Sequence, residues 1–136
     1  MRIFRVIVPV KDINAATQFY GALLGISGER VTSGRHYFHC DGVLLACWDA
    51  LADGDLAFPG PNHGHVYLST SEPLETVRQR AINAGATPDQ TRGTIARQPW
   101  GERSFYARDP WNNPFCVIES GTEYHGGDFG APAPTR

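Results

Sequence analysis

The sequence predicts an α+β domain made of two tandem βαβββ modules. Two observations carry this prediction. Each half of the 136-residue chain contains one strand pattern, one helix pattern and then three short strand patterns, in the same order. A shift of 60 residues also aligns cap and turn positions of the two halves, although few residues are identical. The aligned pairs are Arg5 with His65, Asp12 with Glu72, and Gly25 with Gly85.

The first module is predicted over about residues 1–48. The apolar, β-branched run from Ile3 to Val10 is typical of a strand, and Asp12 is placed to cap a helix that would end at Gly25. Apolar residues recur there with the spacing of one helix face; they are Ala16, Phe19, Tyr20, Leu23 and Leu24. Three strands are predicted to follow, at Glu29–Thr32, His36–Cys40 and Val43–Trp48.

A linker over 49–62, with several Gly and Pro residues, leads to the second module over about 63–119. Alternation predicts a strand over His63–Thr70. Pro73 occupies the expected first position of a helix, and Gly85 its end. Further strands are predicted at Thr91–Ala96, Arg103–Arg108 and Pro114–Glu119. Residues 1–120 then form a single domain, and 121–136 form a flexible C-terminal tail.

Composition excludes several classes of function. The chain has 12 Lys+Arg against 14 Asp+Glu, so it lacks the basic excess of a nucleic-acid-binding protein. No stretch approaches the ~20 apolar residues of a membrane span, and Met1 leads directly into a strand pattern rather than an apolar signal segment. The three cysteines (Cys40, Cys47 and Cys116) lack the number and spacing of a disulfide framework or cysteine-rich zinc site. We therefore expect a cytoplasmic protein with neither nucleic-acid nor membrane partners.

The tandem pattern resembles the glyoxalase/bleomycin-resistance/extradiol-dioxygenase group, the vicinal oxygen chelate superfamily, over about residues 3–119. The segments that carry the resemblance are Val8-Pro9-Val10-Lys11-Asp12, Phe19-Tyr20, Leu24-Gly25, and Pro99-Trp100-Gly101 through Asp109-Pro110-Trp111-Asn112-Asn113 to Ile118-Glu119. The last turn of that family usually reads Asp-Pro-x-Gly-Asn. Asn112 takes the glycine position here, which is acceptable because Asn tolerates the left-handed conformation. The resemblance implies curved sheets that form a cup.

The resemblance also implies that metal-using members hold one divalent ion in the cup, with ligands from the first and last strand of each module. The matching positions are Arg5, Ala46, His65 and Cys116. Arg5 cannot ligate because its guanidinium keeps its protons, and Ala46 has no donor atom. A shift of one residue in the strand register would put Cys47 in place of Ala46, but the ligand set would still include Arg5, which cannot bind a metal. We therefore expect no metal cofactor, and the greatest similarity to the metal-free bleomycin-resistance branch.

Two groups have competing interpretations. His63 and His65 would face the same way on a strand and could share a metal, but no third donor follows at a fixed spacing, so polar pocket histidines are the commoner case. Cys116 could be activated as a nucleophile by His65 and Arg5. A buried inert thiol is the commoner case there too, and no residue is assigned a catalytic role.

Period-two alternation predicts the residues that line the cup. If Arg5 and His65 point into it, the alternate residues of their strands are apolar and pack beneath the helices. The candidate ligand-binding residues are Arg5, Ile7, Trp48, His63, His65, Tyr67, Trp100, Cys116 and Ile118. A buried Arg5 needs an anionic partner, either a ligand or an internal carboxylate. The internal candidates are Glu119, Asp49 and Glu102.

These residues favour a protein that sequesters a small organic ligand without a metal, as a homodimer. Such a lining suits a planar or aromatic compound with an anionic or carbonyl group. The alternative is a metal-dependent lyase, isomerase or dioxygenase of the same superfamily, with an atypical site that includes His65. A third possibility is a structural or regulatory dimer without a ligand.

Overall fold

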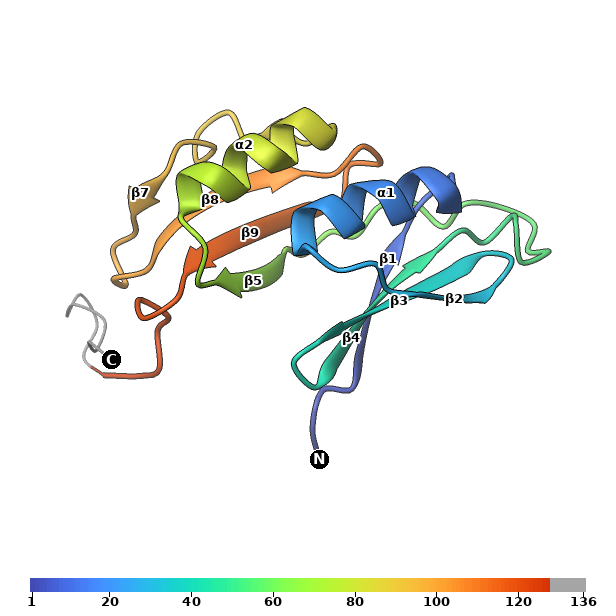
Figure 1. The fold of residues 1–136 in the computed structure, drawn as a ribbon, viewed down its shortest axis with the longest axis horizontal. Helices are drawn as coiled ribbons and strands as arrows, with labels where there is room; N and C mark the ends of the chain where they lie inside the picture. Colours follow the sequence, from blue (N-terminus) through green and yellow to red (C-terminus); the bar gives the residue numbers. More distant parts are fainter. Residues whose placement is uncertain (128–136) are drawn as a thin grey trace. The chain divides into compact units, whose positions relative to one another are not determined.

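A computed structural model describes residues 1–127 of the chain, and it confirms the α+β class. Within those residues it has two helices and nine strands, divided between two units (Figure 1). Unit 1 comprises residues 1–64 and 110–113, and the described part of unit 2 comprises 65–109 and 114–127. Each unit contains one helix and one sheet, as the repeated pattern predicts. Residues 128–136 of the predicted tail lie outside the described part.

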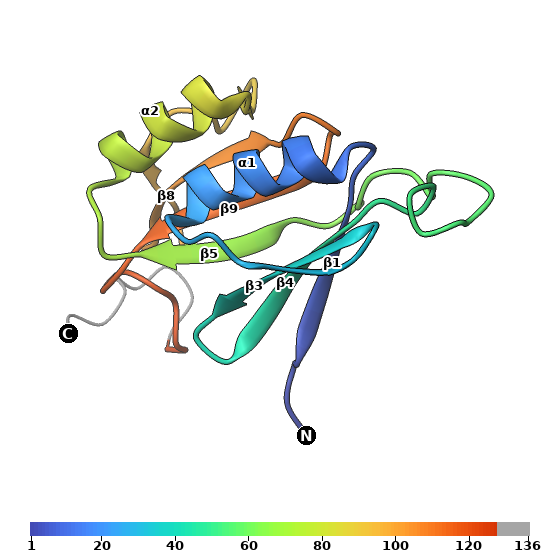
Figure 2. The ribbon, with the colours of Figure 1, turned by 45° about the vertical axis from the view of Figure 1, so that its right-hand side comes forward.

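Unit 1 has the predicted βαβββ order. Its elements are β1 (Arg5–Pro9), α1 (Ile13–Leu24), β2 (Glu29–Thr32), β3 (Arg35–Cys40) and β4 (Val43–Trp48). The sheet order is β1-β4-β3-β2, in which β1 runs parallel to β4 and the other neighbours are antiparallel. Figure 2 shows β1, β4 and β3 side by side.

Local signals set the ends of α1. The Asp12 carboxylate accepts a hydrogen bond from the Ala15 N–H at 3.0 Å, which satisfies a free donor of the first turn. Gly25 adopts a left-handed conformation at φ 73°, and its N–H donates to the Gly21 carbonyl. The helix buries an apolar face against β3 and β4; the buried helix residues are Ile13, Ala16, Phe19, Tyr20 and Leu23.

Unit 2 repeats the arrangement with one additional short strand. Its elements are β5 (Val66–Thr70), α2 (Leu74–Ala84), β6 (Thr87–Pro88), β7 (Ala96–Arg97), β8 (Arg103–Arg108) and β9 (Pro114–Glu119). The sheet order is β5-β9-β8-β6, β7 also pairs with β8, and β5 runs parallel to β9. In Figure 1, α2 lies across β8 and β9, the strands against which it packs.

Several element bounds differ from the sequence prediction; β1, for example, covers Arg5–Pro9 and not Ile3–Val10. Pro73 is the residue before α2 rather than its first residue, because its ψ of 131° is extended. The strand predicted from His63 begins only at Val66. The strand predicted over 91–96 is wrong: the Asp89 carboxylate accepts hydrogen bonds from the backbone N–H groups of Thr91 and Arg92, which closes a tight loop there.

The strand registers extend the repeat to individual side chains. In unit 1, Ala46 of β4 lies between Ile7 of β1 and Tyr37 of β3. In unit 2, the corresponding residue of β9 is Cys116, and it lies between Tyr67 of β5 and Tyr106 of β8. The strands β3 and β8 occupy equivalent places in the two sheets, and each carries a tyrosine at the same register position: Tyr37 in β3 and Tyr106 in β8.

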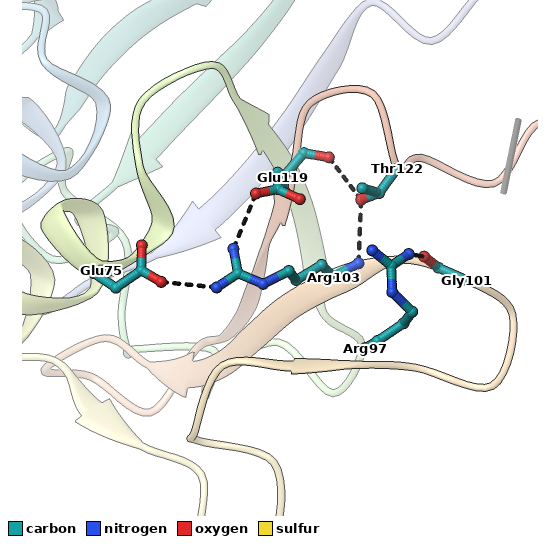
Figure 3. A network of polar contacts seen from close by, with 6 residues as sticks. All are labelled: Glu75, Arg97, Gly101, Arg103, Glu119 and Thr122. Carbon is teal, nitrogen blue, oxygen red and sulfur yellow. Dashed lines mark hydrogen bonds and ion pairs between the residues drawn. The ribbon is translucent and has the colours of Figure 1, made fainter. Parts of the chain in front are cut away.

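Charged residues join α2 to the edges of β8 and β9 in unit 2 (Figure 3). The Arg103 guanidinium donates to Glu119 at 2.9 Å and to Glu75, in the first turn of α2, at 2.7 Å. The Arg103 backbone N–H donates to the Thr122 hydroxyl, which in turn donates to the Glu119 carbonyl. A single arginine thus fixes a helix start, two strands and the chain after β9.

A pair of asparagines closes unit 1 through the 110–113 turn. The side chain of Asn113, which is 1% exposed, donates to the Pro9 carbonyl at 2.7 Å and accepts from the Asn62 backbone N–H at 2.9 Å. The Asn62 side chain donates to the Ile7 carbonyl at 2.9 Å. Asn112 has φ 68°, which confirms the left-handed conformation expected at this position.

Replacing Asn113 by Ala should lower the free energy of unfolding by about 2–4 kcal/mol, because two hydrogen bonds are lost and a buried carbonyl is left without its donor. Urea denaturation of the full chain measures the change. The control is Asn83→Ala, which removes only the exposed side-chain hydrogen bond from Gln79. Equal stability of the two variants would contradict the role assigned to Asn113.

Candidate functional site

Each sheet has one face covered by its helix and a second face that carries polar and aromatic side chains. We name the second face the polar face of that unit. On β5 the alternation is regular: Tyr67 and Ser69 are exposed, whereas the residues between and beside them are half-buried. The unit-1 polar face is formed by Arg5, Ile7, Arg35, Tyr37, His39, Leu44, Ala46 and Trp48. The unit-2 polar face is formed by His65, Tyr67, Ser69, Ser104, Tyr106, Arg108, Cys116 and Ile118.

Arg5 is exposed rather than buried, which corrects the prediction made for it. Its guanidinium carbon lies 5.2 Å from the Tyr37 ring centroid and 5.3 Å from that of Phe4. Phe4 itself is 50% exposed and does not pack beneath α1, because β1 begins only at Arg5. A guanidinium in contact with water and two rings does not need the internal carboxylate that a buried arginine would.

The carboxylates proposed as internal partners of Arg5 make other bonds. Glu119 binds Arg103, and Glu102 accepts the Trp100 indole N–H at 2.7 Å. Asp49 accepts from the Ala52 backbone N–H.

A second guanidinium lies over an aromatic ring on the unit-1 polar face. The Arg35 guanidinium carbon lies 5.4 Å from the Trp48 ring centroid, and Arg35 pairs with Asp53 at 3.5 Å. Asp53 also accepts from the Thr32 hydroxyl and the Gly34 N–H. The hydrogen bond from the Thr32 hydroxyl is the largest of the effects that lower the pKa of the Asp53 carboxyl. The ionised carboxylate therefore holds Arg35 against the indole ring.

An aromatic cluster occupies the unit-2 polar face. The ring centroids of His65 and Tyr106 lie 5.3 Å apart, those of Tyr67 and Tyr106 lie 6.1 Å apart, and both pairs are edge-to-face. Tyr67 is 55% exposed, whereas Tyr106 is buried together with Cys116 and Ile118. The cluster therefore has an outer part in contact with solvent, formed by Tyr67, and a buried inner part, formed by Tyr106, Cys116 and Ile118.

Three titratable groups of this cluster, Cys116, Tyr106 and His65, favour their neutral forms at pH 7. Burial raises the pKa of the Cys116 thiol to about 11, despite hydrogen bonds with Ser104 and Tyr106 that lower it. Burial and a hydrogen bond with Tyr67 raise the pKa of the Tyr106 hydroxyl. Burial, followed by the positive charge of Arg108, lowers the pKa of the His65 imidazole. The face can donate and accept hydrogen bonds but carries no thiolate.

The sequence-predicted site residues separate into two sets. Arg5, Ile7 and Trp48 share the unit-1 polar face. His63 also belongs to unit 1, but it lies exposed in a bend before β5. His65, Tyr67, Cys116 and Ile118 lie together on the unit-2 polar face. Trp100 is half-buried in the loop between β7 and β8.

Sequence reasoning did not select Tyr37 or Tyr106. Both lie on the third strand of a polar face, where only the pairing register reveals that they share a face with Ala46 and Cys116. Arg92 was missed because it was assigned to a strand and not to the loop closed by Asp89. The sequence signal for this loop was Asp89, which precedes Thr91 by two residues and Arg92 by three and can accept hydrogen bonds from their backbone N–H groups.

Comparison with known proteins identifies the family. The sequence matches the glyoxalase-like domain family over residues 5–118. The chain belongs to this family. No match was found among curated proteins. Solved structures that share this fold at 21–24% identity carry the names glyoxalase/bleomycin resistance protein and glyoxalase/bleomycin resistance protein/dioxygenase.

Three solved structures illustrate how far this similarity extends. A glyoxalase/bleomycin resistance protein from Albidiferax ferrireducens T118 is 21% identical, with a TM-score of 0.72 over 86% of this chain and 97% of that one. A glyoxalase-related enzyme from Fulvimarina pelagi is 19% identical, with a TM-score of 0.70 over 100% and 99%. A lactoylglutathione lyase from Agrobacterium tumefaciens is 23% identical, with a TM-score of 0.61 over 88% and 93%. At these identities the likeness shows the fold alone.

The residues of this glyoxalase-like chain do not fit the divalent ion that the superfamily resemblance implies. Arg5 has no lone pair to offer and Ala46 has no donor atom, so only His65 and Cys116 remain, which are too few donors to hold the ion. Within residues 1–127, no three His, Cys, Asp or Glu side chains come together as a metal site. The alternation argument for the His63 and His65 pair also loses its basis, because both residues precede β5, which begins at Val66. Separately, no helix among these residues is long and apolar enough to cross a membrane.

The His65 imidazole should titrate with a pKa below its ordinary value of about 6.5, because burial and nearby Arg108 disfavour the proton. NMR titration of the imidazole resonances measures the midpoint. Arg108→Gln should move the midpoint upward, since a positive charge is removed, and Arg97→Gln should leave it in place. A wild-type midpoint above 6.5 would contradict this assignment.

Proposed function

We propose that this glyoxalase-like protein binds and sequesters a planar aromatic small molecule and uses no metal ion to do so. The observation that carries the proposal is that the tyrosine at the equivalent strand position of each unit lies beneath a guanidinium, which comes from a different element in each unit. Arg5 lies 5.2 Å from Tyr37, and Arg92 lies 5.6 Å from Tyr106. Rings supply a rigid contact area, and guanidinium groups stack on aromatic surfaces and bind oxygen anions.

The protonation of the unit-2 polar face favours reversible binding over covalent catalysis. Cys116 and Tyr106 both keep their protons at neutral pH because burial raises their pKa values. A protonated thiol is a poor nucleophile. The same groups remain hydrogen-bond donors beside exposed Tyr67, which is the mixture of apolar surface and a few polar groups found in ligand sites.

We also propose that the protein forms a homodimer. Several large apolar side chains are exposed in the single chain: Ile3 is 71% exposed and Leu56 is 99% exposed. A second copy would cover such surface and the open sheet faces, and closed two-fold pairs are the commonest soluble oligomers.

A panel of planar aromatic compounds built on naphthalene, quinoline and anthraquinone should contain members that quench tryptophan fluorescence saturably and raise the melting temperature. Tyr67→Ala should weaken their binding about 2- to 10-fold, the equivalent of an aromatic contact of about 0.5–1.5 kcal/mol. Tyr124→Ala is the control, because Tyr124 is a similarly exposed tyrosine in the segment after β9. Absence of saturable binding by every compound would rule out the proposal.

Untagged protein should contain no stoichiometric zinc, nickel, manganese or iron, even after exposure to each ion and desalting, because only His65 among the expected positions is a usual ligand. Elemental analysis measures the content. One ion per chain that is lost in His65→Ala and kept in His63→Ala would favour the metal-dependent lyase, isomerase or dioxygenase instead.

Light scattering at tens of micromolar protein should give twice the 14.9 kDa mass of one chain, because the exposed apolar surface is covered in a pair. Replacing Ile3 by Lys tests the same point, since a charge at a buried contact weakens association. A monomer mass for the wild-type chain at this concentration would refute the homodimer.

A further inference from the structure

Arg92 has a defined position beside the aromatic cluster of unit 2, although it lies in a loop. Its backbone N–H donates to the Asp89 carboxylate at 2.9 Å, and its carbonyl accepts from the Tyr106 N–H at 2.9 Å. The guanidinium carbon lies 5.6 Å from the Tyr106 ring centroid. Because both backbone groups are bonded, the side chain starts from a fixed point next to Tyr106 and His65.

The charges around Arg92 leave this part of the polar face positive. Arg92 and Arg108 both act on the His65 imidazole, and Asp89 is the carboxylate that opposes them. The Asp89 carboxylate is committed to its own loop, where it accepts from the Thr91 N–H, the Thr91 hydroxyl and the Arg92 N–H at 2.9–3.0 Å. Among residues 1–127, no ion pair involves the Arg92 guanidinium.

We propose that Arg92 and His65 bind the carboxylate of an aromatic ligand whose ring lies against the exposed Tyr67. This inference rests on the proposed function and names its ligand class, an aromatic monocarboxylate. The single positive charge of the Arg92 guanidinium matches the single negative charge of a monocarboxylate. The planar guanidinium fits both oxygens of a carboxylate, and the imidazole adds a further N–H donor.

Two ligands of the same shape isolate the carboxylate. The probes are 2-naphthoate and its neutral analogue 2-naphthamide, each titrated into the full-length protein by calorimetry at pH 7. Wild-type protein should bind the naphthoate at least about fivefold more tightly than the amide, a modest factor because the guanidinium is exposed to water. Arg92→Gln should remove this preference while the affinity for the amide stays unchanged.

The matched control is Arg2→Gln. Arg2 is also an exposed arginine over an aromatic ring, 5.4 Å from the Phe4 centroid, so the substitution removes the same charge from a similar setting. It should leave the preference for naphthoate intact.

Each outcome decides the proposal. Preference lost in Arg92→Gln and kept in Arg2→Gln supports it. Preference kept in Arg92→Gln, or lost to the same extent in Arg2→Gln, overturns it. Equal wild-type affinity for the two probes overturns it while aromatic binding stands. If neither probe binds, the carboxylate site is also overturned. The proposed function is tested separately, by the binding of neutral and charged compounds in the naphthalene, quinoline and anthraquinone panel.

Discussion

The parallel pairing of the first strand of each unit with its last strand is the constraint on which the rest of the structure depends. Neighbouring parallel strands cannot be joined by a tight hairpin, so the chain needs a longer connection that includes a helix. In both units that helix covers one sheet face, and polar and aromatic side chains line the other. The polar faces therefore follow from the connectivity of the chain, and side-chain chemistry then distinguishes one face from the other.

The two polar faces share geometry but differ in charge. In unit 1 the guanidinium groups of Arg5 and Arg35 lie over rings, and Asp53 neutralises one of them. In unit 2 the corresponding region is made of neutral phenol, imidazole and thiol groups, with arginines at its margin. The same fold thus supplies one cationic aromatic surface and one surface of neutral hydrogen-bonding groups, which have different preferences for ligands.

Much of the fold could be predicted because strand and helix ends carry local signals: the Asp12 cap and the bounds Val43–Trp48 and Arg103–Arg108 agree with the structure. The prediction over 91–96 failed because side-chain hydrogen bonds to the backbone outweighed strand propensity. For the site, alternation correctly placed His65 and Tyr67 on one face. The exposure of Arg5 and the register that brings Tyr106 beside Cys116 could not be predicted, because they depend on contacts between residues distant in sequence. The homodimer and the single-domain assignment stay predictions.

Unit 1 is discontinuous in sequence, because the Asn113 side chain that binds the Pro9 carbonyl is 104 residues from it along the chain. During synthesis, the first βαβββ segment leaves the ribosome long before this group exists, so its hydrogen bonds stay incomplete until β8 and the following turn have been made. The sequence pattern is that of a repeated module, yet unit 1 is completed by a turn that the second half of the sequence supplies. The segment 1–64 could not be separated as an independent protein with all of the hydrogen bonds of unit 1.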